Sequence, residues 1–498
     1  MKVLIDMRPA LEGFSGIPQE ARLVANGLLK VESLEIDGFL ELPFLSTKHI
    51  NPDVFSQHVN YHSQAIIAWT EKKHYISNRY FAFKKFRLRL AKALMLLKSL
   101  NPLTKIELIH FNAHLFHDFI WRSLFAKSLS ASEKNVALNM NYKISPVPRN
   151  MLYLRLNTHK FPVFNTQGYD VFISHLPFPG NVSKGTSLVV RYHDSIPILM
   201  PHTIENMAKH NQLFFSTLVS NVKSLAWFSC VSETVRQELI QLFPEVESRS
   251  VTIHNMISSC YFFENSSPDR VPHIIRDHLT EFDVKSGLSL IPSFSSNETK
   301  EHFYNQALSP KKINYLLIVS TVEPRKNHLC LIEAWNIIKE EIEPSIKLVV
   351  VGNLGWNYEP ILKKCKTPIE KGQLFMLSSV AASDLRVLYR NAIATVCPSF
   401  AEGFDYSGVE SMRCGGITIA SDIPVHQEIY QDAALYFDPY STDSLVAVLK
   451  SLLKSKSCAQ IQQIRERGNV ISSRYLPEHI LPQWKFFMEK IRLYASLR

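Results

Sequence analysis

The chain lacks several features that would assign it to a specialised class of protein. No stretch of about twenty apolar residues is present, so we expect no membrane-spanning helix. The N-terminus, MKVLIDMRP, begins directly with a strand-like run and lacks the long apolar segment of a signal peptide. The seven cysteines show no paired spacing, and no CxxC motif or Cys/His cluster occurs. These absences disfavour a disulfide scaffold and a zinc module, and they favour a reduced, cytoplasmic chain.

The composition is that of a large globular protein. Of the 498 residues, 46% are hydrophobic and 20% are charged, and a chain of this length predicts two or three domains. Strand-like and helical stretches alternate, which favours an α/β fold. The net charge of +10 indicates an anionic partner, which the charge alone does not distinguish among a nucleotide, an anionic membrane and a nucleic acid.

The most informative stretch runs from 395 to 428 and predicts a strand, a loop, a helix and a second strand. A short apolar run at its start indicates a buried strand end. Ser407 is expected to cap a helix that begins near Val409. Two glycines at 415–416 end that helix, and the second strand runs over 417–420. In open α/β sheets, the carboxyl end of a strand is where ligands bind.

Two carboxylates, Glu402 and Glu410, enclose the loop of this unit with seven residues between them. The loop contains Gly403, Phe404 and Gly408 and offers backbone N–H groups, which suit a phosphate at a helix N-terminus. A carboxylate at such a place is expected to accept hydrogen bonds from ribose or sugar hydroxyls. The alternative is a plain loop charge and a first-turn charge favoured by the helix dipole. The pair, the glycines and the flanking strands together favour a binding site.

A second glycine loop lies near the N-terminus. The apolar run 3–5 predicts a buried strand, Gly13 and Gly16 lie in the loop that follows, and a helical pattern continues through 23–28. Strand, glycine loop and helix begin a nucleotide-binding type of half-domain, although two glycines do not make the dinucleotide fingerprint. A plain turn between a strand and a helix is the alternative.

Two further strands are expected to deliver polar residues to the ligand edge of a sheet. The run 187–194 ends in His193 and Asp194, and the run 313–319 is followed by Arg325 and Lys326. Adjacent cations at that edge suit a diphosphate, because Arg grips phosphate oxygens in a fork and Lys adds a point charge. The alternatives are a structural histidine and a solvated basic turn.

These segments together resemble a known family. The pattern E-G-F-x5-E followed by S-M-x-C-G-G, the tract Y-H-D-x-x-P and the segment E-x-R-K-N resemble the retaining glycosyltransferases of the GT-B fold, family 4. The chain departs from the family pattern at Asp405, where the family often has Gly or Pro.

The resemblance implies two Rossmann-like domains that face each other across a cleft. The acceptor-side domain is expected over 1–250 and the nucleotide-sugar domain over 251–475, with an insertion at about 262–311. A closing helix over 476–498 is expected to cross back to the first domain.

The resemblance also implies roles for individual residues. Glu410 holds the ribose diol, Glu402 orients the sugar, and His193 lies by the donor sugar. The implied catalytic residues are Glu402, His193, Arg325 and Lys326. The implied nucleotide-sugar site comprises Gly13, Gly16, Thr321, Arg325, Lys326, Glu402, Gly403, Phe404, Ser407, Gly408, Val409 and Glu410. No metal or cofactor is expected, since the cations and amides neutralise the leaving diphosphate.

The implied function is transfer of a hexose from a nucleotide-diphosphate sugar, with GDP-mannose favoured, to a growing glycan or lipid-linked acceptor in O-antigen or other polysaccharide synthesis. Two other classes stay open. One is a GT-B nucleotide-sugar epimerase or hydrolase, which needs no acceptor. The other, which the full set of family segments disfavours, is a basic adaptor that binds membrane or nucleic acid without catalysis; for the transferase, no nucleic-acid partner is expected.

Three segments carry weaker signals. Residues 71–100 mix Lys and Arg with aromatic and apolar residues at near-helical spacing, which predicts either peripheral contact with an anionic membrane through 79–98 or a core-packing helix with a basic face. Residues 100–165 look irregular, and their histidines (His110, His114, His117 and His159) are expected to be separate rather than metal ligands. The Ser-, Pro- and Asn-rich run 262–311 indicates an insertion.

Overall fold

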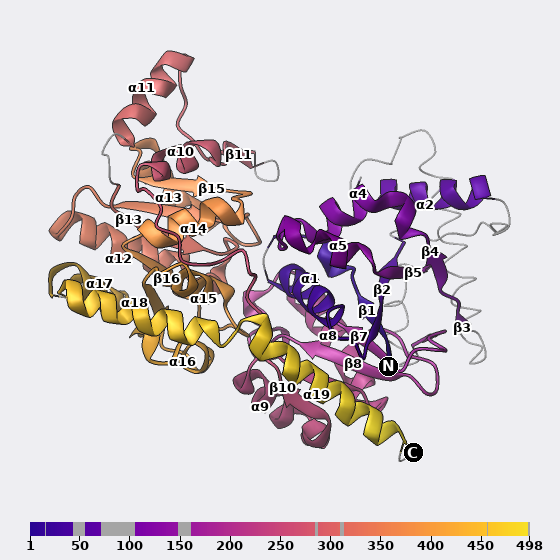
Figure 1. Ribbon diagram of the computed structural model, residues 1–498. Coiled ribbons are helices and arrows are strands. Elements are labelled where there is room, and N and C mark those ends of the chain that lie inside the picture. The colour runs from indigo at the N-terminus through magenta and orange to yellow at the C-terminus, as the bar shows by residue number, and fades with distance from the viewer. Residues whose placement is uncertain are drawn as a thin grey trace.

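The computed structural model describes residues 1–14, 16–42, 55–70, 105–147, 161–283, 287–308, 313–455 and 457–496. The chain forms two α/β domains, joined in the middle of the sequence and bridged again by the C-terminal helix (Figure 1). The predicted basic segment 71–100 lies outside the described residues.

The first domain is built on an eight-stranded sheet with the order β10-β9-β8-β7-β1-β2-β5-β4, and only β4 is antiparallel to its neighbour. Its central strands are continuous apolar runs, as parallel strands covered on both faces require. The strands are β1 Lys2–Asp6, β2 Glu35–Glu41, β4 Ile109–Phe111, β5 Asn141–Ser145, β7 Val171–Ser174, β8 Ser187–Tyr192, β9 Trp227–Cys230 and β10 Ser250–Thr252.

The expectation that residues 100–165 are irregular is wrong, because this segment supplies β4 and β5 to the first sheet. Strand β5 alternates polar and buried apolar residues, with Tyr142 and Ile144 in the core. This period-two pattern is typical of a strand that is buried on one face only. A short parallel pair, β3 Lys105–Ile106 and β6 Val163–Phe164, lies beside it.

The second domain contains a six-stranded, all-parallel sheet with the order β15-β14-β13-β16-β17-β18. The apolar run 313–319 predicted β13, and the run 417–420 predicted β17, each within two residues of the observed bounds. The strands are β13 Tyr315–Val319, β14 Lys347–Val351, β15 Leu374–Leu377, β16 Ala394–Cys397, β17 Thr418–Ser421 and β18 Ala434–Phe437.

Helices cover the faces of both sheets (Figure 1). Those of the first domain are α1 Ile17–Leu28, α2 Phe55–Thr70, α4 His117–Phe119, α5 Lys134–Leu138, α7 Ile196–Leu199, α8 Met207–Lys223 and α9 Glu233–Leu242. Those of the second are α10 Arg270–Asp277, α11 Asn297–Ala307, α12 His328–Glu341, α13 Glu359–Glu370, α14 Ala382–Asn391, α15 Tyr406–Arg413, α16 Pro424–Tyr430, α17 Thr442–Lys450 and α18 Cys458–Ser473. Among the described helices, none is long and apolar enough to cross a membrane.

The Ser-rich segment 262–311 contains two helices and a small hairpin. Helix α10 packs against α14, α11 follows the hairpin of β11 Phe282–Asp283 and β12 Leu288–Ser289, and Ser296 caps α11. Ile274, Ile275 and Tyr304 are buried in the core of the domain. The described part of this segment is therefore packed onto the second domain.

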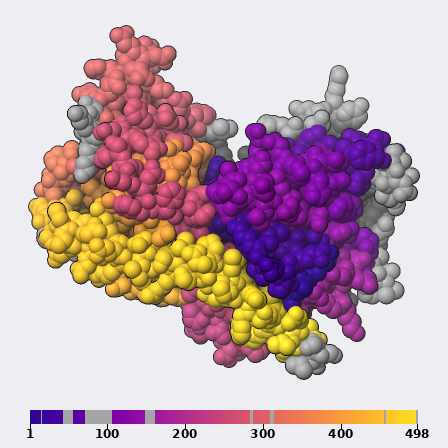
Figure 2. All heavy atoms as spheres, viewed as in Figure 1, coloured from indigo at the N-terminus to yellow at the C-terminus, as the bar shows by residue number. Residues whose placement is uncertain are grey.

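The last helix, α19 Pro477–Ser496, leaves the second domain and lies along the first (Figures 1 and 2). Its buried side chains, including Trp484 and Phe487, join the core that contains β1 and α1. Strand β10 still belongs to the first sheet, so the predicted boundary after residue 250 falls within that strand. Figure 2 shows the two domains as separate lobes with a notch between their upper parts.

Candidate active site

The predicted site residues follow the carboxyl ends of strands from both sheets. In the second domain, Thr321, Arg325 and Lys326 follow β13, and Glu402 follows the neighbouring β16. In the first domain, His193 follows β8. A Cβ placed on Gly403 would collide with the backbone carbonyl oxygen of His193. The two domains therefore meet where these strands end, and only glycine fits at the point of contact.

Glu402 lies between the two predicted cations. Its Oε2 is 3.0 Å from Nη1 of Arg325, and its Oε1 accepts a short hydrogen bond from Nζ of Lys326. Burial alone would raise the pKa of this carboxyl, but the Arg325 and Lys326 charges outweigh burial and hold the pKa below its usual range. Glu402 is therefore an anion at neutral pH, fixed in place by the groups that are expected to bind diphosphate.

Two further carboxyl groups face the same cations. Oε1 of Glu323 accepts a hydrogen bond of 2.8 Å from Arg325, and burial raises the pKa of Glu323 despite that bond. Burial likewise raises the pKa of Asp194, on which the Arg325 charge acts in the opposite direction. Burial lowers the pKa of Arg325, but its acidic neighbours dominate and raise it. The positive charges of Arg325 and Lys326 are therefore compensated by neighbouring carboxyl groups, and a bound anion would compete with those groups for the cations.

The start of α15 differs from the expectation. Asp405, not Ser407, is the N-cap, and its carboxylate accepts hydrogen bonds from the backbone N–H and the hydroxyl of Ser407. The helix therefore begins at Tyr406, three residues before the predicted start at Val409. Asp405 has a φ of 62°, a conformation that glycine adopts without strain, which explains why glycine is common here in the resembled family. Nε2 of His426 lies 3.2 Å from the Asp405 carboxylate.

Three of the predicted nucleotide-sugar residues serve as packing residues here. A Cβ on Gly408 would collide with the ring of Tyr430, so this glycine admits a neighbouring aromatic side chain. Val409 is fully buried, and the Phe404 ring packs against Tyr475 at 5.2 Å between centroids. Because Gly408 has no side chain and the side chains of Val409 and Phe404 are buried, backbone groups are the means by which these three residues could contact a ligand.

Glu410 lies in the interior of α15 and is 4% exposed. Its Oε1 accepts a hydrogen bond of 3.0 Å from Nε2 of Gln19 on α1, and its Oε2 accepts one of 3.0 Å from the hydroxyl of Tyr389. Burial raises the pKa of Glu410 to about 7, while these hydrogen bonds act in the opposite direction. Both carboxylate oxygens are therefore occupied by protein donors, one of which comes from the other domain.

The glycine loop of the first domain abuts this region. Gly16 is the N-cap of α1 and has a φ of 69°, which the resembled loop needs glycine to adopt. Gly13 has ordinary backbone geometry, and its carbonyl oxygen accepts a hydrogen bond of 2.7 Å from Arg22. The buried Arg22 also binds the carbonyl oxygen of Ala10, so a single guanidinium shapes the loop.

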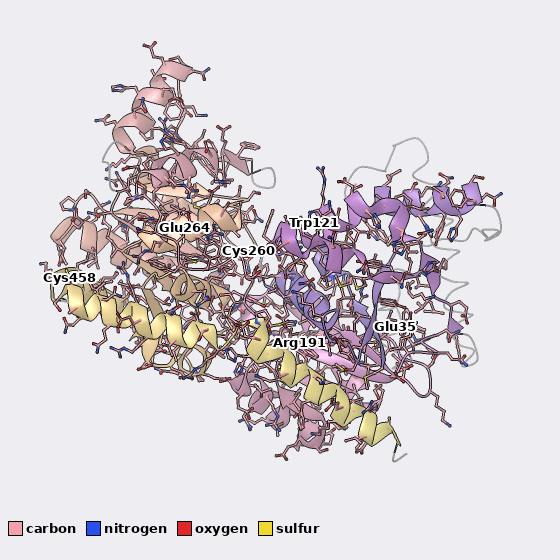
Figure 3. All side chains as sticks on the ribbon, in the orientation of Figure 1. Glu35, Trp121, Arg191, Cys260, Glu264 and Cys458 are labelled. Carbon is pink, nitrogen blue, oxygen red and sulfur yellow. The ribbon has the colours of Figure 1, made fainter. Side chains whose placement is uncertain are left out.

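A buried ion pair behind the loop was not predicted. Nη2 of Arg191 donates to Oε1 of Glu20 at 2.7 Å, and the hydroxyl of Tyr406 donates to Oε2 of the same carboxylate at 2.7 Å. Arg191, which is labelled in Figure 3, also lies over the ring of Trp484 on α19, with 5.3 Å from its guanidinium carbon to the ring centroid. This network joins the first sheet, the start of α15 and the bridging helix. Its signals in the sequence were Glu20 within the helical pattern of α1 and Arg191 within the apolar run of β8.

The side chain of His193 is half-buried at the junction of the two domains. Within the described residues its Nε2 has no hydrogen-bond partner. Burial lowers the pKa of His193 well below its usual value, so the ring is neutral and can bind a hydroxyl group. Thr321 is exposed at the end of β13. Away from the junction, His114 and His117 contact each other and His110 lies in β4, and no group of metal-binding side chains occurs in the described ranges.

The match to a family model now has a structural context. Residues 299–469, which include the Glu402 and Glu410 segment, match the model described as glycosyl transferases group 1. The matched segment lies within the second domain. It carries Arg325, Lys326 and both glutamates, whereas the first domain contributes His193 and the glycine loop.

Curated relatives match parts of the chain. O-antigen chain mannosyltransferase B of Escherichia coli is 31% identical over 151 residues, which are 30% of this chain and 40% of the relative. O-antigen chain mannosyltransferase RfbU of Salmonella typhimurium is 26% identical over 227 residues, 42% of this chain and 62% of the relative. The chain therefore spans less than two thirds of the length of these relatives.

Solved structures match the whole architecture. Sucrose-phosphate synthase from Thermosynechococcus elongatus superposes with a TM-score of 0.57 at 13% identity, over 100% of both chains. TarM superposes with a TM-score of 0.53 at 11% identity, over 98% of both chains. These likenesses confirm the expected GT-B fold, with two facing α/β domains.

Proposed function

We propose that the protein is a retaining glycosyltransferase that moves a hexose from a nucleotide-diphosphate sugar, with GDP-mannose favoured, to a growing or lipid-linked glycan in O-antigen synthesis. The observation that carries this proposal is Glu402, ionised between Arg325 and Lys326 at the end of β16. The group 1 domain and the O-antigen mannosyltransferases among the relatives support the donor and pathway.

The cation pair suits the hard part of the reaction, which is the growth of negative charge on the leaving diphosphate. Arg325 and Lys326 present adjacent positive groups at the sheet edge, and preorganised charges of this kind stabilise developing charge most in a site that excludes water. In the proposed reaction these cations take the place of a metal ion. The start of α15 adds a helix N-terminus beside them.

The proposed chemical step retains configuration. The bond between the anomeric carbon and the diphosphate oxygen breaks, a bond to the acceptor oxygen forms on the same face of the sugar, and the acceptor's proton passes to the leaving phosphate. Glu402 orients the sugar hydroxyls, and the neutral His193 imidazole binds a further hydroxyl from the opposite domain. Glu410 receives the ribose after its bonds to Gln19 and Tyr389 give way.

The test is transfer of radiolabelled mannose from GDP-mannose to a lipid-linked oligosaccharide by the purified full chain. UDP-, ADP- and dTDP-sugars form the donor panel, and the reaction is repeated with EDTA. We expect GDP-mannose to be used best, with an α-linked product and no loss of rate in EDTA. A product that contains no acceptor would favour an epimerase or hydrolase, and transfer that requires a divalent cation would contradict the metal-free step.

The lipid-linked acceptor places the proposed reaction at the inner face of a membrane, with residues 79–98 as the contact; these lie outside the described residues. Co-sedimentation with phosphatidylglycerol vesicles, compared with neutral phosphatidylcholine vesicles, tests that contact. Equal recovery with both kinds of vesicle would remove it from the proposal.

A further inference from the structure

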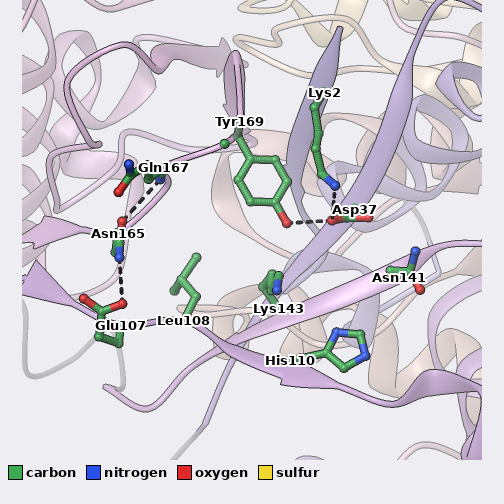
Figure 4. Close-up of a pocket in the computed structure, with 11 residues that line it drawn as sticks. Lys2, Asp37, Glu107, Leu108, His110, Asn141, Lys143, Asn165, Gln167 and Tyr169 are labelled. Carbon is green, nitrogen blue, oxygen red and sulfur yellow. Dashed lines mark hydrogen bonds and ion pairs between the residues drawn. The ribbon is translucent and has the colours of Figure 1, made fainter.

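A cavity of about 450 Å³ opens in the first domain at the other end of its strands (Figure 4). Lys2 and Asn141, the first residues of β1 and β5, line it, whereas the catalytic cleft lies beyond the last residues of β1 and β8. The five residues of β1 separate the two places by roughly 16 Å, at about 3.3 Å per residue. The cavity is therefore distinct from the cleft.

The cavity has a polar floor made by one face of the sheet. The strand register pairs Asp37 with Asn141 and Lys143 with His110, so three adjacent strands present polar side chains at one place. Along β5 these residues alternate with Tyr142, which is buried on the other face. Further along the same face of the sheet, the side chains become apolar, and Leu4 and Phe39 belong to the hydrophobic core. The polar set is thus confined to the cavity.

Asp37 distinguishes this cavity from an ordinary solvated sheet face. It is 4% exposed, its Oδ2 accepts a hydrogen bond of 2.6 Å from the hydroxyl of Tyr169, and Nζ of Lys2 lies 3.8 Å from the same oxygen. Its Oδ1 is buried and has no hydrogen-bond partner within the described residues. Because a buried acceptor without a donor costs free energy, this oxygen indicates that a donor arrives from outside.

The charges of the lining cancel. Lys2 and Lys143 bring two positive groups, and Asp37 and Glu107 bring two carboxylates. Burial and the nearby Lys143 charge lower the pKa of His110, so its ring is neutral at pH 7. A balanced lining gives no advantage to a phosphate or another strong anion.

The lining offers both donors and acceptors at close range. Glu107 accepts a hydrogen bond of 2.7 Å from Asn165, while the side chains of Asn141 and Lys143 make no side-chain hydrogen bond to the described residues. Hydroxyl groups, which both donate and accept, match such a mixed set. The volume lies within the range of about 300–1,000 Å³ that is usual for small-ligand sites.

We propose that this cavity is a second carbohydrate site, which holds a neutral sugar of the growing glycan away from the catalytic cleft. The identity of that glycan rests on the proposed function, whereas the existence of the site rests on the cavity itself. A glycan anchored here stays bound between successive additions at the cleft, so the affinity for acceptor rises with chain length.

The test is calorimetric titration of the full chain, saturated with GDP, with neutral tetrasaccharides built from mannose, glucose, galactose or rhamnose. The test variant is Asn141→Ala combined with Lys143→Met, because neither side chain makes a side-chain hydrogen bond to the described residues. Lys223→Met, an exposed position at the end of α8 outside the cavity, is the matched control. We expect one tetrasaccharide to bind and the double variant to weaken it at least tenfold, with the control unchanged.

Transfer kinetics separate this inference from the proposed function. If both hold, the double variant raises KM for a tetrasaccharide acceptor and leaves KM for a disaccharide acceptor and for the donor unchanged. Tetrasaccharide binding that depends on Asn141 and Lys143 in a protein without transferase activity would support the site and refute the function. Equal affinities in the wild type and the double variant, binding of none of the sugars, or displacement of the sugar by inorganic phosphate would overturn the site.

Discussion

The two glutamates of the 402–410 segment meet opposite environments. Glu402 faces two cations, whereas Glu410 is surrounded by neutral donors, which include Gln19, Tyr389 and Tyr261. Burial opposes ionisation at both, yet the pKa of Glu402 is lowered and that of Glu410 is raised to about 7. The same residue type is therefore a fixed anion at one end of the segment and a half-protonated acid at the other.

The two environments determine which protein contacts a bound nucleotide sugar must replace at Glu402 and at Glu410. A diphosphate competes with Glu402 for Arg325 and Lys326, so it acts against an ion pair. A ribose hydroxyl competes with Gln19 and Tyr389 for Glu410, so it exchanges one hydrogen bond for another. The first exchange is electrostatic and the second is nearly neutral in charge, and substitutions at the two ends should differ accordingly.

The largest effect is expected from Glu402→Gln. The change keeps the shape of the side chain but removes its charge, and loss of a group aligned with the reacting sugar costs about 10²–10³ in kcat. Arg325 and Lys326 also lose an anion, so GDP should bind more tightly and raise the melting temperature more than it does in the wild type. Steady-state transfer and a thermal-shift titration with GDP measure the two effects. Near-normal turnover in this variant would sink the assignment of Glu402.

Lys326→Ala should have the next largest effect on transfer. It should weaken nucleotide binding, whereas Glu402→Gln should strengthen it. A charge-assisted hydrogen bond contributes about 1.5–3 kcal/mol, so kcat/KM for the donor should fall by roughly 10- to 150-fold. Lys364→Ala, on the exposed face of α13, is the matched control and should leave donor use unchanged. Equal donor affinity in the Lys326 variant and the wild type would show that Arg325 alone binds the diphosphate.

Glu410→Gln should change how the free energy of unfolding depends on pH. The folded-state pKa of about 7 exceeds the ordinary value of 4.5, so the folded protein binds more protons than the unfolded chain between these values. The free energy of unfolding therefore falls as pH rises from about 4.5 to about 7, by about 3 kcal/mol. The amide resembles the protonated acid, so the variant should lose this slope and be more stable than the wild type at pH 8. Urea unfolding across pH 4–8 measures it, and parallel curves would contradict the raised pKa.

Much of the fold was predictable because it depends on local patterns. Apolar runs located the parallel strands, and their alternation with helices predicted the α/β architecture that the GT-B neighbours confirm. Ser232, a residue type that favours helix N-caps, accepts a hydrogen bond from the backbone N–H of Val235 and caps α9. These features require only the residues next to one another in the chain.

The electrostatic setting of the site was not predictable from local patterns. Asp405 takes the cap of α15 through a positive φ, which side-chain preference alone does not reveal. Gln19 reaches Glu410 across 391 positions, and Glu20 meets Arg191 across 171. The first contact forms only when the two domains face each other, and the second only when α1 packs on the first sheet. The different environments of Glu402 and Glu410 therefore arise only in the folded protein.

We expect the smallest effect from removing single hydrogen-bond donors to Glu410. The informative comparison is between Gln19→Leu and Tyr389→Phe. Each removes one neutral donor from Glu410, so each should raise its pKa further and shift the pH dependence of stability upward. Only Gln19 comes from the first domain, and its hydrogen bond is worth about 1 kcal/mol. Small-angle scattering without nucleotide should therefore show a larger radius of gyration for Gln19→Leu and no change for Tyr389→Phe. Equal radii would mean that Glu410 is a buried acid of the second domain alone, whereas a difference would make it the point at which protonation, ribose binding and domain closure are coupled.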